Sequence, residues 1–174
     1  MPTALDIFER HHRAVFRFLR RMMGGGHEAE DLTQEVFLRV LRALDTYEER
    51  QLERAWVFRI ARNVWLDHLR VRRRAGAAGE ADRAPVARLA AVQSTRVALD
   101  QALGRLQEAD REAFLMREIG GLGYAEIADV LGITPSAVRN RIHRARLALR
   151  ECLDPPRATL RVSSRMERRA WKPM

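Results

Sequence analysis

YAEIADVLGITPSAVRNRIHRARLAL, residues 124–149, is the stretch of this sequence that decides its fold. Its first part repeats apolar residues at helical spacing and stops at Gly132, which permits the backbone conformation that ends a helix. Thr134 is a suitable N-cap for a second helix, and Pro135 takes the first helical position, where a missing N–H costs nothing. Two helices joined by so short a glycine-containing turn predict a helix-turn-helix, whose second helix enters the major groove of DNA.

The two helices of this motif each have an apolar face and a polar face. The residues expected to be buried are Tyr124, Ile127, Ala128, Leu131, Val138, Ile142, Ala145 and Leu149. The exposed face of the second helix is basic and carries Ser136, Arg139, Asn140, His143 and Arg144, with Arg141, Arg146 and Arg150 at its flanks. Arginine reads guanine, asparagine reads adenine, and flanking arginines pair with phosphate. The pattern favours sequence-specific DNA binding over a merely solvated basic face.

The composition of the whole chain agrees with an anionic partner. The 174 residues carry a formal net charge of +9, and 47% of them are hydrophobic, so the chain is able to build a core. Most of the positive excess is arginine, whose planar fork suits phosphate and base edges. Nucleic acid and a membrane surface both remain candidates on composition alone.

The single cysteine and the N-terminal residues exclude several classes of protein. Cys152 is the only cysteine, which excludes an internal disulfide and a thiolate zinc site. The N-terminal residues lack a continuous apolar segment, and no apolar run is long enough to cross a bilayer. We therefore expect a cytoplasmic protein without membrane insertion. No glycine-rich nucleotide loop, paired acid–base residues or metal motif is present, so no catalytic residue, metal or cofactor is assigned.

Helical periodicity extends over most of the chain. It predicts seven helices, over about 3–22, 28–44, 53–73, 96–106, 108–119, 124–131 and 135–152. The first helix is expected to bury Leu5, Phe8, His12, Val15, Phe16, Leu19 and Met22. The fold class is all-α: two small helical domains joined by a flexible linker. The expected divisions are a three-helix domain over 1–74, a linker over 75–95, a four-helix domain over 96–153 and a basic tail over 154–174, expected to be disordered.

The second and third predicted helices expose surfaces of different character. On the second, the residues expected on or near the exposed face are Asp31, Gln34, Glu35, Leu38 and Arg42, a mixture that suits a protein partner. The third combines basic and aromatic residues: Trp56, Arg59, Arg62, Asn63, Trp65 and Arg70. Basic residues beside aromatic ones suit single-stranded DNA. Trp65 is expected in the core, and for Trp56 core and DNA contact both stay open.

The C-terminal motif resembles region 4 of sigma-70-family proteins, above all in the string VRNRIHRAR. In that family this domain reads the −35 promoter element. The resemblance implies DNA contacts from Arg117, Ser136, Arg139, Asn140 and His143. It implies phosphate contacts or packing for Arg141, Arg144 and Arg146.

The N-terminal half resembles region 2 of the same family. AEDLTQEVFLRV is similar to the part that docks on the clamp helices of RNA polymerase, which implies polymerase contacts from Asp31, Gln34, Glu35 and Leu38. AWVFRIARNVWLDHLR is similar to the part that melts and recognises the −10 element. The residues implied there are Trp56, Arg59, Arg62, Asn63 and Arg70, with the loop around Asp45–Leu52 forming part of a base pocket.

The order and separation of the two matches are typical of the compact extracytoplasmic-function group. They imply a sigma factor whose partners are core RNA polymerase, promoter DNA and an anti-sigma factor. Three other classes are alternatives: a dimeric helix-turn-helix regulator that binds palindromes without polymerase, an enzyme with an appended DNA-binding domain, and a membrane-surface protein. For residues 154–174, added DNA or partner contacts from the arginines and Trp171 are the alternative to disorder.

Overall fold

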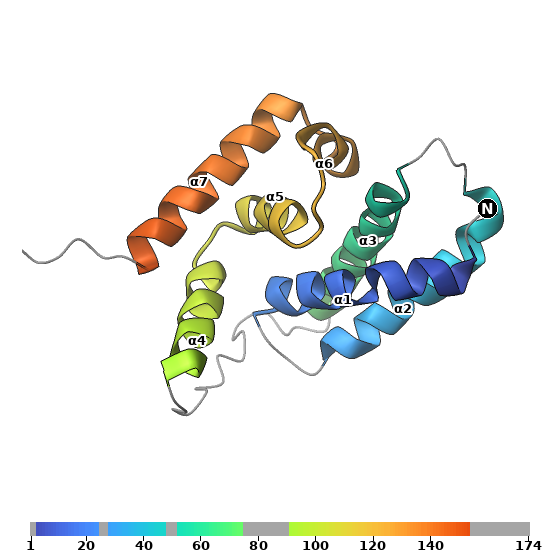
Figure 1. Ribbon diagram of the computed structural model, residues 1–174, viewed down its shortest axis with the longest axis horizontal. Coiled ribbons are helices and arrows are strands. Elements are labelled where there is room, and N and C mark those ends of the chain that lie inside the picture. The colour runs from blue at the N-terminus through green and yellow to red at the C-terminus, as the bar shows by residue number, and fades with distance from the viewer. Residues whose placement is uncertain (1–2, 25–27, 48–51, 75–90, 154–174) are drawn as a thin grey trace, which may run out of the picture.

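The protein is described here by a computed structural model that covers residues 3–24, 28–47, 52–74 and 91–153. Its elements are α1 (Ala4–Met22), α2 (Glu28–Ala43), the 3-10 helix η1 (Leu44–Thr46), α3 (Glu53–Arg74), α4 (Ala91–Gly104), α5 (Glu108–Glu118), α6 (Tyr124–Leu131) and α7 (Pro135–Leu153). The described residues form no strand. Figure 1 shows α1, α2 and α3 packed as one bundle, with α4 to α7 gathered beside it. The predicted all-α fold of three helices followed by four is confirmed.

Helix α1 packs against both other helices of the N-terminal bundle, α2 and α3. The core face expected for it is wrong at Leu5 and Phe8, which are 65% and 41% exposed, and His12 and Phe16 are only half-buried. Ile7, His11 and Phe18 are buried instead. Apolar residues recur at helical spacing along two neighbouring faces of α1. The contacts of α1 with α2, α3, α4 and α5 decide which of the two faces is buried.

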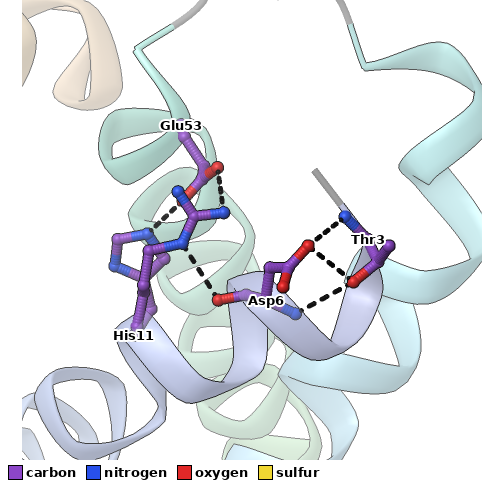
Figure 2. Close-up of polar contacts among 5 residues, drawn as sticks. Thr3, Asp6, His11 and Glu53 are labelled. Atoms are coloured by element: carbon purple, nitrogen blue, oxygen red, sulfur yellow. Dashed lines mark hydrogen bonds and ion pairs between the residues drawn. The ribbon is translucent and has the colours of Figure 1, made fainter. Parts of the chain in front are cut away.

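The start of α1 is fixed by a capping box that Figure 2 shows. The Asp6 backbone N–H donates to Thr3 Oγ1 at 3.2 Å, and the Thr3 backbone N–H donates to Asp6 Oδ2 at 2.8 Å. One turn later, His11 Nε2 lies 2.7 Å from Glu53 Oε1, and Arg10 Nη2 lies 3.1 Å from Glu53 Oε2. Because Glu53 is the first residue of α3, these contacts tie the beginning of α3 to α1.

The third helix places both of its tryptophans inward. Trp65 is buried, as expected. Trp56 is only 9% exposed, and its ring centroid lies 4.7 Å from that of Tyr47. For Trp56, where core and DNA contact were both open, this structure places the ring in the core.

The helix-turn-helix forms as the sequence predicts. Gly132 has φ of 67° at the end of α6, and Thr134 Oγ1 accepts from the Ala137 backbone N–H at 3.2 Å at the start of α7. Pro135 is the first residue of α7. The four positions expected to be buried on this helix are all buried: Val138, Ile142, Ala145 and Leu149.

The structure and the sequence differ at the start of the C-terminal half. Helix α4 begins at Ala91, five residues before the expected start of this domain at 96. The expected linker residues 75–90 and the tail 154–174 lie outside the described residues. Among the described residues, none of the helices is long and apolar enough to span a membrane.

Candidate DNA and polymerase interfaces

The second helix of the helix-turn-helix exposes three of its predicted base-reading residues together. Arg139, Asn140 and His143 are exposed, on the side of α7 opposite its buried positions. Ser136 is also exposed, in the first turn of the helix. Because the buried positions hold α7 against α5 and α6, the helix presents these groups outward on a rigid support.

Two other arginines of α7 have intramolecular acidic partners. Arg144 donates to both carboxylate oxygens of Asp110, at 2.9 and 2.6 Å, and Arg146 donates to Glu118 at 2.8 Å. The hydrogen bonds that Arg144 donates to Asp110 raise the pKa of Arg144. A bidentate arginine–carboxylate pair fixes the geometry of both groups, so Arg144 fastens α7 to α5. The resemblance implies phosphate contacts or packing for these residues, and in the structure Arg144 is ion-paired with Asp110 while its side chain stays 59% exposed.

Arg117 and Arg141 lie behind the exposed face. Arg117 donates to the Leu122 carbonyl oxygen at 2.8 Å, and its guanidinium lies 5.3 Å from the centre of the Tyr124 ring. The guanidinium of Arg139 approaches the same ring at 6.0 Å. Arg141 is half-buried. Arg117 therefore supports the turn before α6, and with it the position of Tyr124 beside Arg139.

The residues of α3 assigned to the −10 element differ in exposure and in their ion pairs. Arg59 and Asn63 are exposed, one turn apart on the helix. Arg62 is half-buried, and its Nε donates to Glu112 Oε1 of α5 at 2.9 Å. Arg70 donates to Asp67 at 2.6 Å. The structure thus brings Arg59 and Asn63 together on one free surface and pairs Arg62 with the C-terminal half.

Helix α2 carries the mixed surface that the sequence predicts. Asp31, Gln34 and Leu38 are exposed, and Leu38 is 47% exposed although it is apolar. Leu41, one turn further along, is 57% exposed and was not among the predicted residues. Its spacing of three from Leu38 is the signal that could have found it.

Glu35 differs from the other residues of α2 that are predicted to contact polymerase, because it has an intramolecular ion pair. It accepts from Arg39 Nε at 2.7 Å, and Arg39 also donates to Asp67 of α3 at 2.8 Å. The hydrogen bond from Arg39 lowers the pKa of Asp67. Arg39 therefore links α2 to α3, and Glu35 helps to orient this link.

Two acidic residues make the most important contacts that the sequence pattern does not indicate. Asp110 and Glu112 are both buried, on α5, and each pairs with an arginine of another helix. Burial raises the pKa of Glu112, and the nearby Arg62 opposes this rise. Among the described residues, no group of three or more His, Cys, Asp or Glu side chains is arranged to hold a metal ion.

Comparisons with known proteins identify both halves. Residues 7–75 match the family model for Sigma-70 region 2, and residues 96–149 match that for Sigma-70, region 4. The RNA polymerase sigma factor CarQ of Myxococcus xanthus is 39% identical over 152 residues, covering 85% of this chain and 87% of CarQ. The ECF RNA polymerase sigma factor SigE of Mycolicibacterium smegmatis is 38% identical over 163 residues, which cover 88% of this chain and 62% of SigE.

Solved structures agree with this assignment. CnrH in complex with the cytosolic domain of CnrY is 30% identical with a TM-score of 0.66, and the match covers 87% of each chain. The fold is also that of the sigma factor RpoE from Bartonella quintana, crystallised with the anti-sigma factor NepR, at 24% identity and a TM-score of 0.74 over 86% of this chain and 96% of RpoE. From these matches, the chain belongs to the sigma-70 family and, within it, to the extracytoplasmic-function group of RNA polymerase sigma factors.

Proposed function

We propose that this sigma factor divides promoter recognition among three surfaces: α2 for core RNA polymerase, α3 for the opened −10 strand and α7 for the −35 duplex. The observation that carries the proposal is the exposure of Arg139, Asn140 and His143 on a capped, well-supported helix. Such a helix offers base-reading groups to the major groove without a rearrangement of its own domain. In this scheme the protein performs no chemistry, and its contribution is binding energy.

The polymerase surface of the proposal consists of Asp31, Gln34, Glu35 and Leu38, and Leu41 extends it. An apolar pair exposed between polar groups suits a protein interface better than it suits DNA. The link from Glu35 through Arg39 to Asp67 supports this helix from behind.

For the −10 element, the proposal assigns Arg59 and Asn63 as the groups that first meet the opened strand. Opening a base pair costs a few kcal/mol per flipped base, and contacts to the extruded base and its phosphates offset that cost. Arg62 and Arg70 belong to the same surface once their carboxylate partners release them. Trp56 contributes by packing beneath this surface.

The proposal includes two further features that follow from family membership. One is control by an anti-sigma factor, which the resemblance to the extracytoplasmic-function group implies. The other is action in the cytoplasm, where RNA polymerase transcribes DNA. The linker and the tail have no assigned contact in this scheme.

A polymerase-binding experiment tests the assignment of α2. The double variant Gln34→Ala/Leu38→Ala removes two exposed groups and is expected to weaken binding to purified bacterial core polymerase by about tenfold or more. Arg13→Ala, which removes an exposed arginine of α1, is the matched control and is expected to bind as the wild type does. Equal affinities of the double variant and the wild type, with both folded, would remove α2 from the interface.

A further inference from the structure

Helix α1 carries arginines on the side that faces away from the core. Its buried residues, from Ile7 to Met22, recur at helical spacing and mark the side that packs against the other helices. Arg13, Arg17 and Arg20 follow one another at spacings of four and three on the opposite side, and all three are exposed. We call these three residues the arginine row.

The arginine row has no acidic partner, unlike its neighbours on the same helix. Arg10 lies 3.1 Å from a carboxylate oxygen of Glu53. Arg21 lies 3.7 Å from a carboxylate oxygen of Asp100. The three guanidiniums of the row, in contrast, form no ion pair with any residue that the structure describes. Each of them is therefore available to an anion from outside the protein.

The positive charges of α1 lie close to one another along the helix. Arg17 is four residues from both Arg13 and Arg21, and like charges at this spacing destabilise a helix. Burial is the main cause that lowers the pKa of Arg21, and Asp100 opposes this change. The charges of Arg17 and Arg20 lower the same pKa further. The row is therefore a concentration of positive charge that an external anion would stabilise.

The helix dipole accounts only for the end of the arginine row. Basic residues in the last turn of a helix are stabilised by its negative C-terminal pole, and Arg20 lies in that turn. Arg13 and Arg17 lie before the last turn, where the dipole has little effect. Their repulsion is therefore not offset within the helix, which favours an anionic partner.

The chemistry of the row suits DNA better than a protein partner. The centre of a protein interface is depleted of charge and contains apolar or aromatic anchors. The two large apolar residues that α1 exposes, Leu5 and Phe8, lie near the start of the helix, and Phe8 is five residues before Arg13. Between Arg13 and Arg20, this side of the helix offers guanidiniums, which bind phosphate in a bidentate geometry.

The length of the row also suits a DNA backbone. From Arg13 to Arg20 an α-helix rises about 10.5 Å. One strand of a duplex presents a phosphate about every 3.4 Å along the helix axis. The three guanidiniums therefore extend over about three phosphates of one strand.

We propose that the arginine row binds the phosphate backbone of double-stranded DNA without reading its sequence. A single strand fits less well, because sites for single strands add exposed aromatic rings, and the Phe16 ring beside the row is half-buried with the Arg20 guanidinium 5.9 Å from its centre. The contact goes beyond the three surfaces proposed above, because α1 has no part in them. It adds the same binding energy at every promoter and makes binding more sensitive to salt.

A salt titration of duplex binding tests the proposal with the full-length protein and without polymerase. Fluorescence anisotropy gives the association constant for a fluorescein-labelled duplex of mixed sequence at several concentrations of potassium chloride. Each phosphate contact contributes about 0.9 to the slope of the logarithm of this constant against the logarithm of salt concentration. Arg13→Gln/Arg17→Gln removes two contacts and is expected to reduce the slope by about 1.8.

Two matched variants separate the row from the net charge of the protein. Arg42→Gln/Arg105→Gln removes the same charge from exposed arginines on α2 and directly after α4, and should keep the slope of the wild type. Arg13→Lys/Arg17→Lys keeps the charge of the row and should also keep the slope, because a contact that does not read sequence depends on charge. Far-UV circular dichroism checks that every variant is helical.

A second duplex, of equal length and different base composition, tests whether the row reads sequence. Arg13→Gln/Arg17→Gln should weaken binding to both duplexes by the same factor, and unequal factors would overturn a contact to the backbone alone. An unchanged slope in this variant would overturn the DNA contact, and a loss of affinity for purified core polymerase in its place would assign the row to an acidic protein surface.

An equal loss of slope in Arg42→Gln/Arg105→Gln would show that net charge, and not the row, determines duplex binding. A lysine variant with the slope of the glutamine variant would also overturn the proposal. None of these measurements depends on base reading by α7 or on strand capture by α3. Their failure is therefore distinguishable from a failure of the proposed function.

Discussion

Replacing Arg139 with alanine tests the reading of DNA by α7 most specifically. The side chain is exposed, and the contact that the structure gives it is a guanidinium 6.0 Å from the centre of the Tyr124 ring. A cation–π contact at an exposed site contributes about 0.5–1 kcal/mol, so the fold should lose little stability. A bidentate arginine–guanine contact, in contrast, contributes about 1–3 kcal/mol of discrimination between bases.

The expected loss of specificity follows from these energies. Discrimination of about 1–3 kcal/mol corresponds to about a 5- to 150-fold difference in affinity between the preferred base and another base. Arg139→Ala should reduce this ratio to near one at a single position of the upstream element. The assay is competition binding of the polymerase holoenzyme to duplex fragments that differ at one upstream position, followed by fluorescence anisotropy.

Two matched variants separate specificity from stability. Arg150→Ala removes an exposed arginine eleven residues further along α7, about 16 Å away at the rise of an α-helix, and should leave base preference unchanged. Arg144→Ala leaves the buried carboxylate of Asp110 without its partner and should cost about 1–3 kcal/mol of stability. If Arg139→Ala keeps its full discrimination at every upstream position while it remains folded, the assigned role of Arg139 is wrong.

Three further perturbations test how the fold supports these surfaces. Gly132→Ala places a side chain at φ of 67° with nothing within 4 Å of its Cβ, so backbone strain alone should lower the free energy of unfolding by about 1–2 kcal/mol. Chemical denaturation measures this change, and an unchanged free energy of unfolding would contradict the left-handed cap. His11→Ala leaves one oxygen of Glu53 without its partner at the start of α3 and should cost about 1–3 kcal/mol by the same measurement, whereas a stability equal to that of the wild type would show that the pair does not hold α3. The pKa of Asp67 is lowered mainly by the hydrogen bond from Arg39, so Asp67 stabilises the fold above the ordinary carboxyl pKa and loses this effect as pH falls towards the lowered pKa. Asp67→Asn should therefore flatten the acid limb of a curve of stability against pH. An unchanged acid limb would refute this.

The part of the fold that could be predicted from the sequence is the part with local signals. Gly132, Thr134 and Pro135 mark the ends of two helices within four residues, and the apolar spacing of α7 selects its buried face. Each signal acts between residues close in sequence, so no knowledge of distant partners is needed.

The features that could not be predicted depend on distant partners. Leu5 and Phe8 are exposed because the contacts of α1 with α2, α3, α4 and α5 are made by the neighbouring row of residues, and helical spacing does not choose between adjacent rows. Arg62 and Glu112 are separated by fifty positions in sequence, so nothing near either residue indicates their pairing. In the same way, Trp56 and Tyr47 lie on different elements, and helical spacing does not indicate that their rings meet.

Run-off transcription on a library of random promoters, with purified bacterial core polymerase and the full-length protein, tests the central claim most directly. The account predicts that transcribed templates are enriched in two short elements at a fixed separation, and that transcripts start at a fixed distance downstream of the second element. Arg139→Ala should change the upstream element, and Asn63→Ala should change the downstream element. Transcripts that start at the same places with and without the protein would contradict the account.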